Sequence, residues 1–512
     1  MFLSLQVTIL KTGDTIGTIF GEFVYLEMIE MKKPNIILIT TDQQRFDTIQ
    51  ALGNPVIYTP HLNWLTDEGV TYTRTYAECP ICVASRTSIM TGMRGYVSGI
   101  SRNCDHSALM ESVKTLPQLL TENGYQTRAI GKMHFHPARA NYGFEHMELP
   151  LDYYRMMQRN YEQGVPKMHG VGENEVEPVL STVDENHSLT HWTVDRSVDF
   201  LETRDERRPF FLWTSFSKPH PPLDPCPNYW NLYETDDMPD PVYGDWSKDF
   251  ETMPKGFLQS TFMLNNIHRL SPKQQRAVKR AYYACITQID YSLGFLFSRL
   301  RELNLMDNTY IIFTSDHGDM MGDHHMGAKM TFLEGSAHVP LIIKAPNQSE
   351  LYKKTKGLRC DNIEELSYLY HTILSIAGIS NPSEQTEKVD LTKDFEVKVN
   401  REFYGFCQDA TNTYSVMDGQ YKYLYTEAFG QELLFDLQND PMEQVNLAAQ
   451  PDFQPIVSTF RSKLSQWALQ YHPELILPTG EFQVTAGAEQ AEKSRKWPGY
   501  HSIRFEGADV LH

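Results

Sequence analysis

Short runs of consecutive apolar residues recur along this chain, and polar residues follow each of them. The runs long enough for strands lie at residues 35–39, 210–216, 310–314 and 340–343, and a further strand is predicted over residues 126–130, before Gly131-Lys132. Unbroken apolar runs of this length are typical of strands that are buried on both faces of a parallel sheet. We therefore predict such strands at these positions.

Segments with helical periodicity separate these runs. Helices are predicted over residues 61–68, 115–123, 191–202 and 273–303. Thr59 and Pro60 predict the start of the first helix, as N-cap and first helical residue, and Gly69 predicts its end. Strands that alternate with helices indicate an α/β fold with a doubly wound sheet.

The pattern changes after about residue 385. Asp418-Gly419, between runs of Tyr, Val and Leu, predicts a tight hairpin over 414–425. Short strands at 403–406 and 432–435 and a helix over 453–471 complete a predicted smaller antiparallel sheet with one packed helix. We predict an N-terminal extension over residues 1–30, a main domain over 31–385, and a C-terminal α+β subdomain with a tail over 386–512.

The composition is that of an ordinary globular protein. Among 512 residues, 41% are hydrophobic and 22% are charged, which excludes a disordered or collagen-like chain. A formal charge of −19 argues against nucleic acid and anionic membranes as general partners. No stretch approaches the roughly 20 apolar residues that span a bilayer, so we expect no membrane span.

The N-terminus and the cysteines bear on location. Residues 2–10 resemble a short signal-sequence core, but no basic residues precede them and glutamates follow where a cleavage site would lie. Seven cysteines, an odd and sparse set, favour a reducing compartment over a disulfide framework. We expect a cytoplasmic protein, with a periplasmic or secreted one as the alternative.

Polar residues with chemical potential follow the predicted strands. Asp42, Lys132, His220 and Asp316 each come just after one of them. Ligands of doubly wound sheets bind beyond the carboxyl ends of the strands. Asp42, Gln43, Asp316 and His317 together offer two carboxylates, an amide oxygen and an imidazole, which indicates a divalent metal site.

The segment Cys79–Gly92 carries the most specific pattern. Taken alone, Cys79-x-x-Cys82 is a possible redox pair, although no thioredoxin-sized βαβ unit surrounds it. The second cysteine also opens Cys82-x-Ala-Ser-Arg86, with Thr91-Gly92 following. This pattern resembles the signature of the type I, formylglycine-dependent sulfatases of the alkaline phosphatase superfamily.

The resemblance implies that Cys82 is oxidised to formylglycine (3-oxoalanine) by a formylglycine-generating maturation enzyme. The hydrated aldehyde is then the nucleophile. A helix N-terminus suits an anionic sulfate, and Arg86, one turn on, can hold the aldehyde and an ester oxygen. Asp42, Gln43, Asp316 and His317, with modified Cys82, are expected to bind one divalent ion. Calcium is the family expectation, and the His317 nitrogen leaves manganese or another transition metal as the alternative.

Three further motifs resemble the same family. These are Gly131-Lys132-Met133-His134, Lys218-Pro219-His220-Pro221, and Lys329 twelve residues after His317. By resemblance, Lys132 and Lys329 hold sulfate oxygens, His220 protonates the leaving alcohol, and His134 accepts a proton when the sulfated intermediate collapses. Lys218 and His106 are predicted substrate contacts, whereas Asp323, His324 and His325 are expected to be structural or at the substrate rim.

The resemblance covers most of residues 33–450 and implies a mixed sheet between helices with a smaller C-terminal sheet. Gln43, where most members carry Asp, resembles the branch of choline sulfatases and phosphonate monoester hydrolases. The expected reaction is hydrolysis of a sulfate ester, on a small molecule or a glycan and most often on a carbohydrate. A phosphonate or phosphate ester hydrolase is the alternative, and a non-catalytic or redox protein using Cys79 and Cys82 is a third hypothesis.

Overall fold

The computed structural model describes residues 33–160, 174–251, 253–257, 265, 267–408 and 411–486. The predicted extension at residues 1–30 and the end of the predicted tail lie outside these residues. The domain boundaries at residues 30 and 385 stay predictions.

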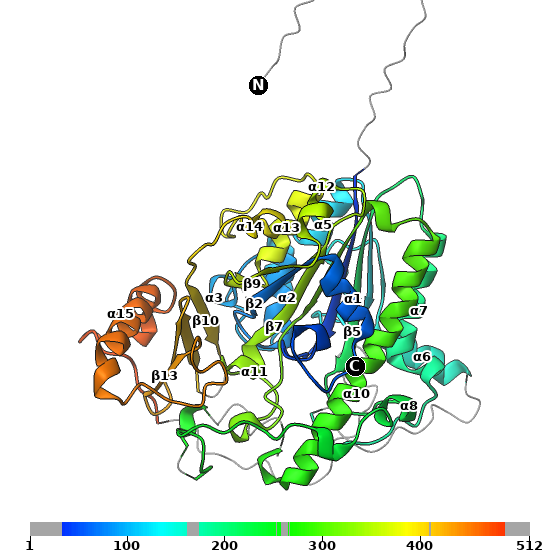
Figure 1. Ribbon diagram of the computed structural model, residues 1–512. Coiled ribbons are helices and arrows are strands. Elements are labelled where there is room, and N and C mark those ends of the chain that lie inside the picture. The colour runs from blue at the N-terminus through cyan, green and yellow to red at the C-terminus, as the bar shows by residue number, and fades with distance from the viewer. Residues whose placement is uncertain are drawn as a thin grey trace, which may run out of the picture. The chain divides into compact units, whose positions relative to one another are not determined.

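Within the described residues, the larger sheet has nine strands in the order β4-β3-β5-β1-β6-β7-β2-β8, with β9 paired to β2 (Figure 1). The strands are β1 Asn35–Asp42, β2 Val70–Tyr76, β3 Gln126–Gly131, β4 His146–Glu148, β5 Phe210–Pro219, β6 Thr309–Ser315, β7 His338–Lys344, β8 Leu358–Cys360 and β9 Glu364–Glu365. All five predicted strands therefore belong to one sheet, as expected.

The sheet is mixed because of β7. Strands β4, β3, β5, β1 and β6 run parallel, whereas β7 is antiparallel to both β6 and β2. Strand β2 was not predicted, since its sequence VTYTRTY lacks an unbroken apolar run. The direction of β2 matters for the site. Because β2 runs parallel to β6, the segment that follows β2 begins at the edge of the sheet where β6 ends.

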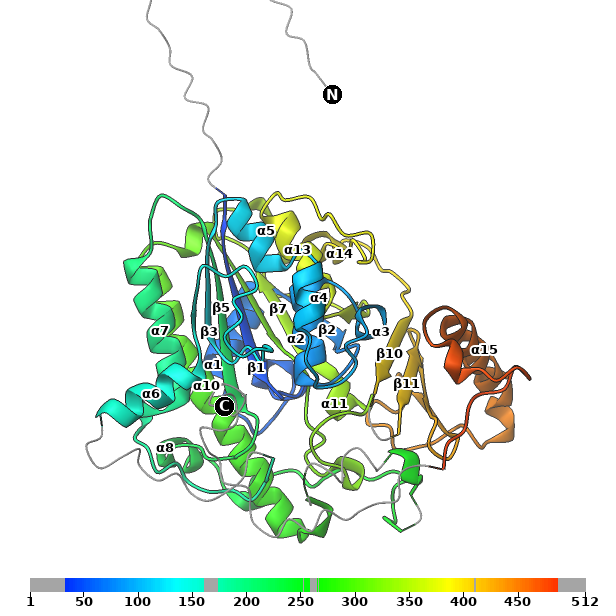
Figure 2. The same cartoon turned by 180° about the vertical axis from the view of Figure 1, so that it is seen from behind.

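Helices cover both faces of this sheet (Figures 1 and 2). One face is covered by α1 (Pro60–Glu68), α7 (Leu189–Thr203) and α10 (Pro272–Glu302), and the other by α2 (Cys82–Thr91), α5 (Leu116–Glu122) and α13 (Tyr368–Ile376). Side chains of β1 alternate between the two cores: Ile37 and Ile39 pack on the first face, Ile36 and Leu38 on the second. This double burial explains the unbroken apolar run.

Shorter helices lie in the connections between these elements. They are α3 Gly95–Ser98, α4 Ser107–Ser112, α6 Pro150–Asn160, α8 Pro227–Trp230, α11 Glu334–Ala337, α12 Glu350–Thr355 and α14 Leu391–Asp394. Among all helices of the described residues, none is long and apolar enough to cross a membrane.

The predicted cap of α1 is wrong in one respect. The hydroxyl of Thr59 accepts from the Gln50 backbone N–H at 2.9 Å instead of capping its own helix. The carboxylate of Asp290, from the middle of α10, accepts from the backbone N–H groups of His61 (3.1 Å) and Leu62 (2.7 Å). A tertiary contact therefore satisfies the orphan donors that a local cap was expected to satisfy.

The smaller sheet has the predicted antiparallel topology. It consists of β10 Phe403–Cys407, β11 Thr413–Met417, β12 Tyr421–Thr426 and β13 Gln431–Asp436, paired in sequence order. Asp418 forms the predicted turn, since its carboxylate accepts from the backbone N–H groups of Gln420 and Tyr421, each at 2.8 Å. Helix α15 (Gln454–Tyr471) packs on one face, while the other shares an apolar cluster with Ile81, Val83 and Ala84 around the start of α2.

Candidate active site

Five segments that are distant in sequence meet at the carboxyl edge of the parallel strands. Asp42 ends β1, Lys132 follows β3, His220 follows β5 and Asp316 follows β6. Cys82, the first residue of α2, arrives through β2. We refer to these residues, together with Gln43, Arg86, His317 and Lys329, as the Cys82 site; each of them is at most 4% exposed.

The turn after β1 is shaped to present two side chains. The pairing of β1 with β5 shifts register between Thr40 and Asp42, and Gln43 adopts a positive φ of 73°. The backbone N–H of Gln43 donates to Asp316 Oδ1 at 3.1 Å, and Tyr282 from α10 donates to the Gln43 carbonyl at 2.6 Å. The strained turn is thus held from two sides.

The Cys82 sulfur lies at the centre of the site. It is 2.9 Å from Lys329 Nζ, 3.3 Å from His317 Nε2 and 3.9 Å from Asp42 Oδ1. Burial and the Asp42 carboxylate oppose ionisation of the thiol, but Lys329, Lys132 and His317 outweigh them, so that the pKa of Cys82 lies well below its usual value. Position 82 is therefore adapted to an anionic or electron-rich group.

The donor set fits a divalent cation. The ligand atoms of Asp42, Cys82, Asp316 and His317 all lie within 4.8 Å of one another, and all four residues are buried. His317 Nδ1 donates to the Gly318 carbonyl at 2.9 Å, which leaves Nε2 to face Asp316 Oδ1 at 3.7 Å and Asp42 Oδ1 at 3.8 Å. These separations are too long for hydrogen bonds and suit atoms that share an ion about 2.3–2.6 Å from each.

Cations surround the two carboxylates. Lys132 Nζ lies 2.6 Å from Asp42 Oδ2, and Arg86 contacts both carboxylates. Burial raises the pKa of Asp42, but Lys132 and the other cations outweigh it and hold the pKa well below its usual range. Burial and neighbouring Asp42 instead raise the pKa of Asp316. The site thus holds positive charge toward the space where an anionic ester would lie.

All three nitrogens of the Arg86 guanidinium contact protein groups. Nε donates to Asp316 Oδ2 at 3.0 Å, and one terminal nitrogen lies 3.0 Å from the same oxygen and 3.5 Å from Asp42 Oδ2. The other donates to the Lys132 carbonyl at 2.6 Å and to Ser215 Oγ at 2.8 Å. Arg86 therefore organises the carboxylates and the β3 terminus in this structure.

Two histidines flank the site as the sequence predicts. His220 Nδ1 lies 2.8 Å from the Pro221 carbonyl, so that Nε2 is the nitrogen suited to proton transfer. Burial, Lys329 and Lys132 lower the pKa of His220 well below its usual value. Burial also lowers the pKa of His134, which adopts a positive φ of 57° and interacts with Cys82.

The two predicted substrate contacts are engaged with protein groups. Lys218 forms an ion pair with Asp224 and donates to the Pro222 carbonyl at 2.5 Å. His106 Nδ1 lies 2.9 Å from Thr87 Oγ1, and the His136 backbone N–H donates to its Nε2 at 3.3 Å. Both side chains are held by these polar contacts in this structure, and their substrate roles stay predictions. Asp323 pairs with Arg45 at 2.7 Å, and His324 Nδ1 lies 2.7 Å from Ser247 Oγ, so both are engaged with protein groups. Their structural or substrate-rim role stays a prediction.

Sequence reasoning missed two polar residues beside the site. Ser215, within the apolar run of β5, donates to the Lys132 carbonyl at 2.6 Å and accepts from Arg86. Asp319 accepts from Gln43 Nε2 at 2.5 Å. Asp319 stands in the motif Asp316-His317-Gly318-Asp319, which was a signal for it, whereas nothing in the local pattern distinguished Ser215 from a strand residue.

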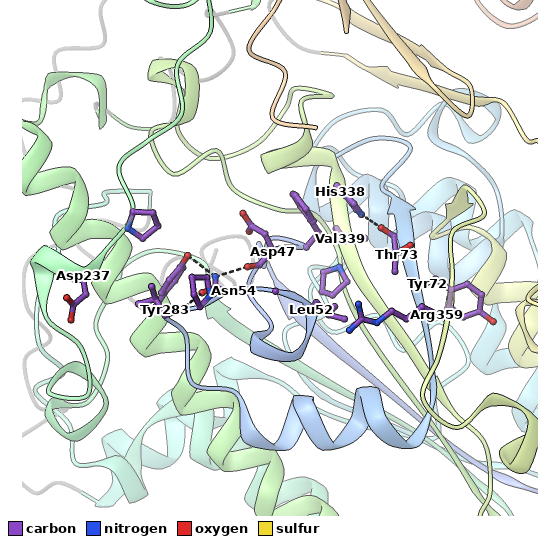
Figure 3. A pocket seen from close by; sticks show the side chains of 16 residues that line it. Asp47, Leu52, Asn54, Tyr72, Thr73, Asp237, Tyr283, His338, Val339 and Arg359 are labelled. Atoms are coloured by element: carbon purple, nitrogen blue, oxygen red, sulfur yellow. Dashed lines mark hydrogen bonds between the residues drawn. The ribbon is translucent and has the colours of Figure 1, made fainter. Parts of the chain in front are cut away.

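Two cavities lie away from the Cys82 site. Figure 3 shows one of about 650 Å³, lined by Asp47, Tyr283, His338 and Arg359 among others; a second, of about 690 Å³, shares His338 with it. Residues of the Cys82 site line neither cavity. Asn54 donates to Tyr283 and to the Asp47 carbonyl in the first cavity, so its polar groups are already paired. The clustered charged groups lie instead at the Cys82 site.

Comparison with known proteins agrees with this geometry. Residues 34–379 match the family model described as Sulfatase, and residues 322–470 match the one described as N-sulphoglucosamine sulphohydrolase, C-terminal. The chain is 34% identical to an arylsulfatase of Clostridium perfringens over 468 residues, covering 84% of this chain and 94% of the relative. It is 27% identical to a choline-sulfatase of Rhizobium meliloti, covering 92% of each.

A solved structure shares the fold. The phosphonate monoester hydrolase of Agrobacterium radiobacter superimposes with a TM-score of 0.71 at 22% identity, covering 86% of this chain and 96% of that one. The mixed sheet, the separate four-stranded sheet and the family match agree. The chain therefore belongs to the sulfatase family, in the sulfatase branch of the alkaline phosphatase superfamily, and is a sulfuric ester hydrolase.

Proposed function

We propose that this protein hydrolyses a sulfate ester on a carbohydrate, with a formylglycine formed from Cys82 as nucleophile. The observation that carries the proposal is the position of the Cys82 sulfur. It lies at the N-terminus of α2, 2.9 Å from the Lys329 ammonium and among both carboxylates and His317. A hydrated aldehyde at this position would supply the oxygen that attacks sulfur.

Asp42, Gln43, Asp316, His317 and the side chain at position 82 would hold the divalent cation. Calcium is the expected ion, and the imidazole ligand makes manganese the alternative to test. When bound, the cation supplies Lewis-acid stabilisation of charge on the sulfate oxygens. The Gly318 carbonyl accepts from His317 Nδ1, which fixes the tautomer and directs Nε2 to this site.

Lys132, Lys329 and the first turn of α2 would bind the sulfate group. Both ammonium groups lie in the buried site, and the backbone N–H groups of a helix N-terminus attract anions. Charge that develops on the ester during S–O cleavage is stabilised most strongly by donors already in place in a dry site. Lys132 is held by Asp42 and Lys329 by Gln43, so neither needs to reorganise.

Proton transfer would fall to the two histidines. His220 would donate a proton to the leaving alcohol, and His134 would accept one when sulfate is released. Burial and two lysines lower the pKa of His220 in the substrate-free site, and a bound anionic ester would favour its protonation by offsetting Lys132 and Lys329. This dependence links acid catalysis to the presence of a bound anion.

A phosphonate or phosphate ester hydrolase is the second candidate. The observation in its favour is Gln43 beside Asp42, where a second carboxylate would repel a doubly charged phosphate monoester. Initial rates on matched aryl sulfate, phosphate and phosphonate esters separate the two candidates. A dominant rate on a phosphorus ester would replace the sulfate ester as the substrate.

The nucleophile is tested by the mass of the tryptic peptide Thr75–Arg86. The protein is produced with and without a co-expressed formylglycine-generating enzyme, and fragmentation locates the aldehyde. We expect the aldehyde at position 82 and sulfatase activity in proportion to it. The matched control is Cys79→Ala, which should keep both, since Cys79 is fully buried in an apolar cluster, whereas Cys82→Ala should lose both. Two intact thiols in a fully active enzyme would refute the proposal.

A further inference from the structure

The side chain of Gln43 lies between an anion and a cation. Its Nε2 donates to Asp319 Oδ2 at 2.5 Å, and its Oε1 accepts from Lys329 Nζ at 3.0 Å. A carboxylate can only accept and an ammonium can only donate, so just one orientation of the amide satisfies both neighbours. The oxygen of Gln43 therefore faces Lys329, which itself lies 2.9 Å from Cys82 Sγ.

Asp319 is held rigidly enough to impose this orientation. It is 1% exposed, and its other oxygen accepts from the backbone N–H groups of Met321 and Ala328, each at 2.9 Å. The Arg45 guanidinium also donates to the Asp319 carbonyl at 3.0 Å. The carboxylate thus closes the loop that leads to Lys329 and cannot turn away from Gln43 without losing these contacts.

We propose that Asp319 is a positioning residue that keeps the amide oxygen of Gln43, not its nitrogen, toward Lys329 and the divalent cation. This inference rests on the proposed function, because the cation and the role of Lys329 come from there. Asp319 itself lies behind Gln43 and would act only through it. An amide that turned over would present N–H groups to an ammonium and a cation, and would lose both of its hydrogen bonds.

The test exchanges donor and acceptor between the two residues. In Asp319→Asn, the remaining oxygen can still accept from Met321 and Ala328, but the new NH₂ faces the NH₂ of Gln43, which should then turn over. In Gln43→Glu, two carboxylates face each other and repel. In the double variant, the new amide at position 319 donates to the new carboxylate at position 43, whose second oxygen again faces Lys329. The double variant should therefore behave more like the parent than either single one.

Two measurements on the full-length protein, with Cys82 not oxidised, test this exchange of donor and acceptor. Calorimetric titration of chelator-treated protein with Ca²⁺, and separately with Mn²⁺, should show Asp319→Asn binding about 10–100-fold more weakly than the parent, as is typical when a group behind a metal ligand is changed. The double variant should regain at least about tenfold of that loss. Melting temperatures in EDTA should show the same order without any metal.

Asp323→Asn is the matched control. Asp323 is another buried carboxylate of this loop, pairs with Arg45 at 2.7 Å and has no hydrogen bond to Gln43, so Gln43→Glu should change this variant only as much as it changes the parent. Additive losses in the double variant, in both metal affinity and melting temperature, would overturn the inference and leave Asp319 a loop-closing residue only. Because neither readout needs formylglycine or substrate, a failure of the proposed nucleophile leaves this test intact. If the parent binds neither cation, the melting temperatures in EDTA decide.

Discussion

Replacing Arg86 with methionine should destabilise the metal-free protein mainly through Asp316. Asp42 retains Lys132 at 2.6 Å, whereas Arg86 is the cation in direct contact with Asp316. Asp316 would keep two backbone donors, from Gln43 and His317, but no neighbouring lysine or arginine in contact among the described residues. Methionine fills much of the volume of arginine, so the loss is chiefly electrostatic.

The expected cost is about 3–5 kcal/mol, the usual effect of removing one partner of a buried ion pair. This is a large part of the roughly 5–15 kcal/mol by which proteins of ordinary stability are folded. The measurement is guanidinium unfolding at neutral pH in EDTA and in excess Ca²⁺. Calcium should reduce the cost, because a cation bound by Asp316 replaces the lost positive charge and favours the folded state.

Two variants make this reasoning refutable. Asp316→Asn in the Arg86→Met background removes the unpaired charge and should recover most of the loss in EDTA. A cost below about 1 kcal/mol, which is the range of an exposed ion pair, would contradict the electrostatic account. So would an equal loss when Arg86→Met is made in the Asp316→Asn background, since no unpaired carboxylate would then remain at position 316 to explain it.

Three further predictions concern the surrounding structure. Lys422→Met should cost about 3–5 kcal/mol in chemical unfolding, because Lys422 is 2% exposed and stands between two buried glutamates; a cost near zero would contradict this. Burial lowers the pKa of His324 to about 4, so folding stability should fall as pH drops from about 6.5 toward 4, by up to about 1.4 kcal/mol per pH unit, and His324→Gln should flatten this slope. Gly131→Ala should abolish folding or activity, since Gly131 has a φ of 91° and a Cβ there would lie 1.9 Å from a carbonyl oxygen of β5. Gly124→Ala meets open space, so it should still fold and stay active, at a cost of about 1–2 kcal/mol from the left-handed backbone alone (φ 89°).

Much of the fold follows from local patterns. The buried strands were predictable because burial on both faces demands apolar residues at every position, as in β1. The hairpin at Asp418-Gly419 was predictable because its turn chemistry is local. Strand β2 was missed because its neighbours, β7 and β8, bury residues such as Thr71 and Thr75 that have no apolar signature. Thr59 is the N-cap residue of α1 as predicted, but its side chain makes no capping hydrogen bond, because Asp290 of another helix accepts from the first backbone N–H groups instead.

The candidate site divides in the same way. The site residues that lie close together within one sequence motif could be predicted. They are Cys82 with Arg86, Asp316 with His317, and Lys132 with His134. The contacts that orient these side chains could not be predicted, because they join segments that are distant in sequence. Asp319 to Gln43 and Ser215 to Arg86 are examples, and the direction of a side chain depends on what packs behind it.

The sequence by itself determined the two sheets, the helices between the strands and the chemical inventory at the strand ends, since burial, turns and motifs act over a few residues. Only the tertiary structure decided the antiparallel course of β7, which lets β2 bring Cys82 to the edge where β1 and β6 end. It alone decided which way the Gln43 amide faces and that Arg86 binds carboxylates. These features depend on groups that meet only in the folded protein. Contacts between segments distant in sequence produce no periodic pattern of residues from which they could be predicted.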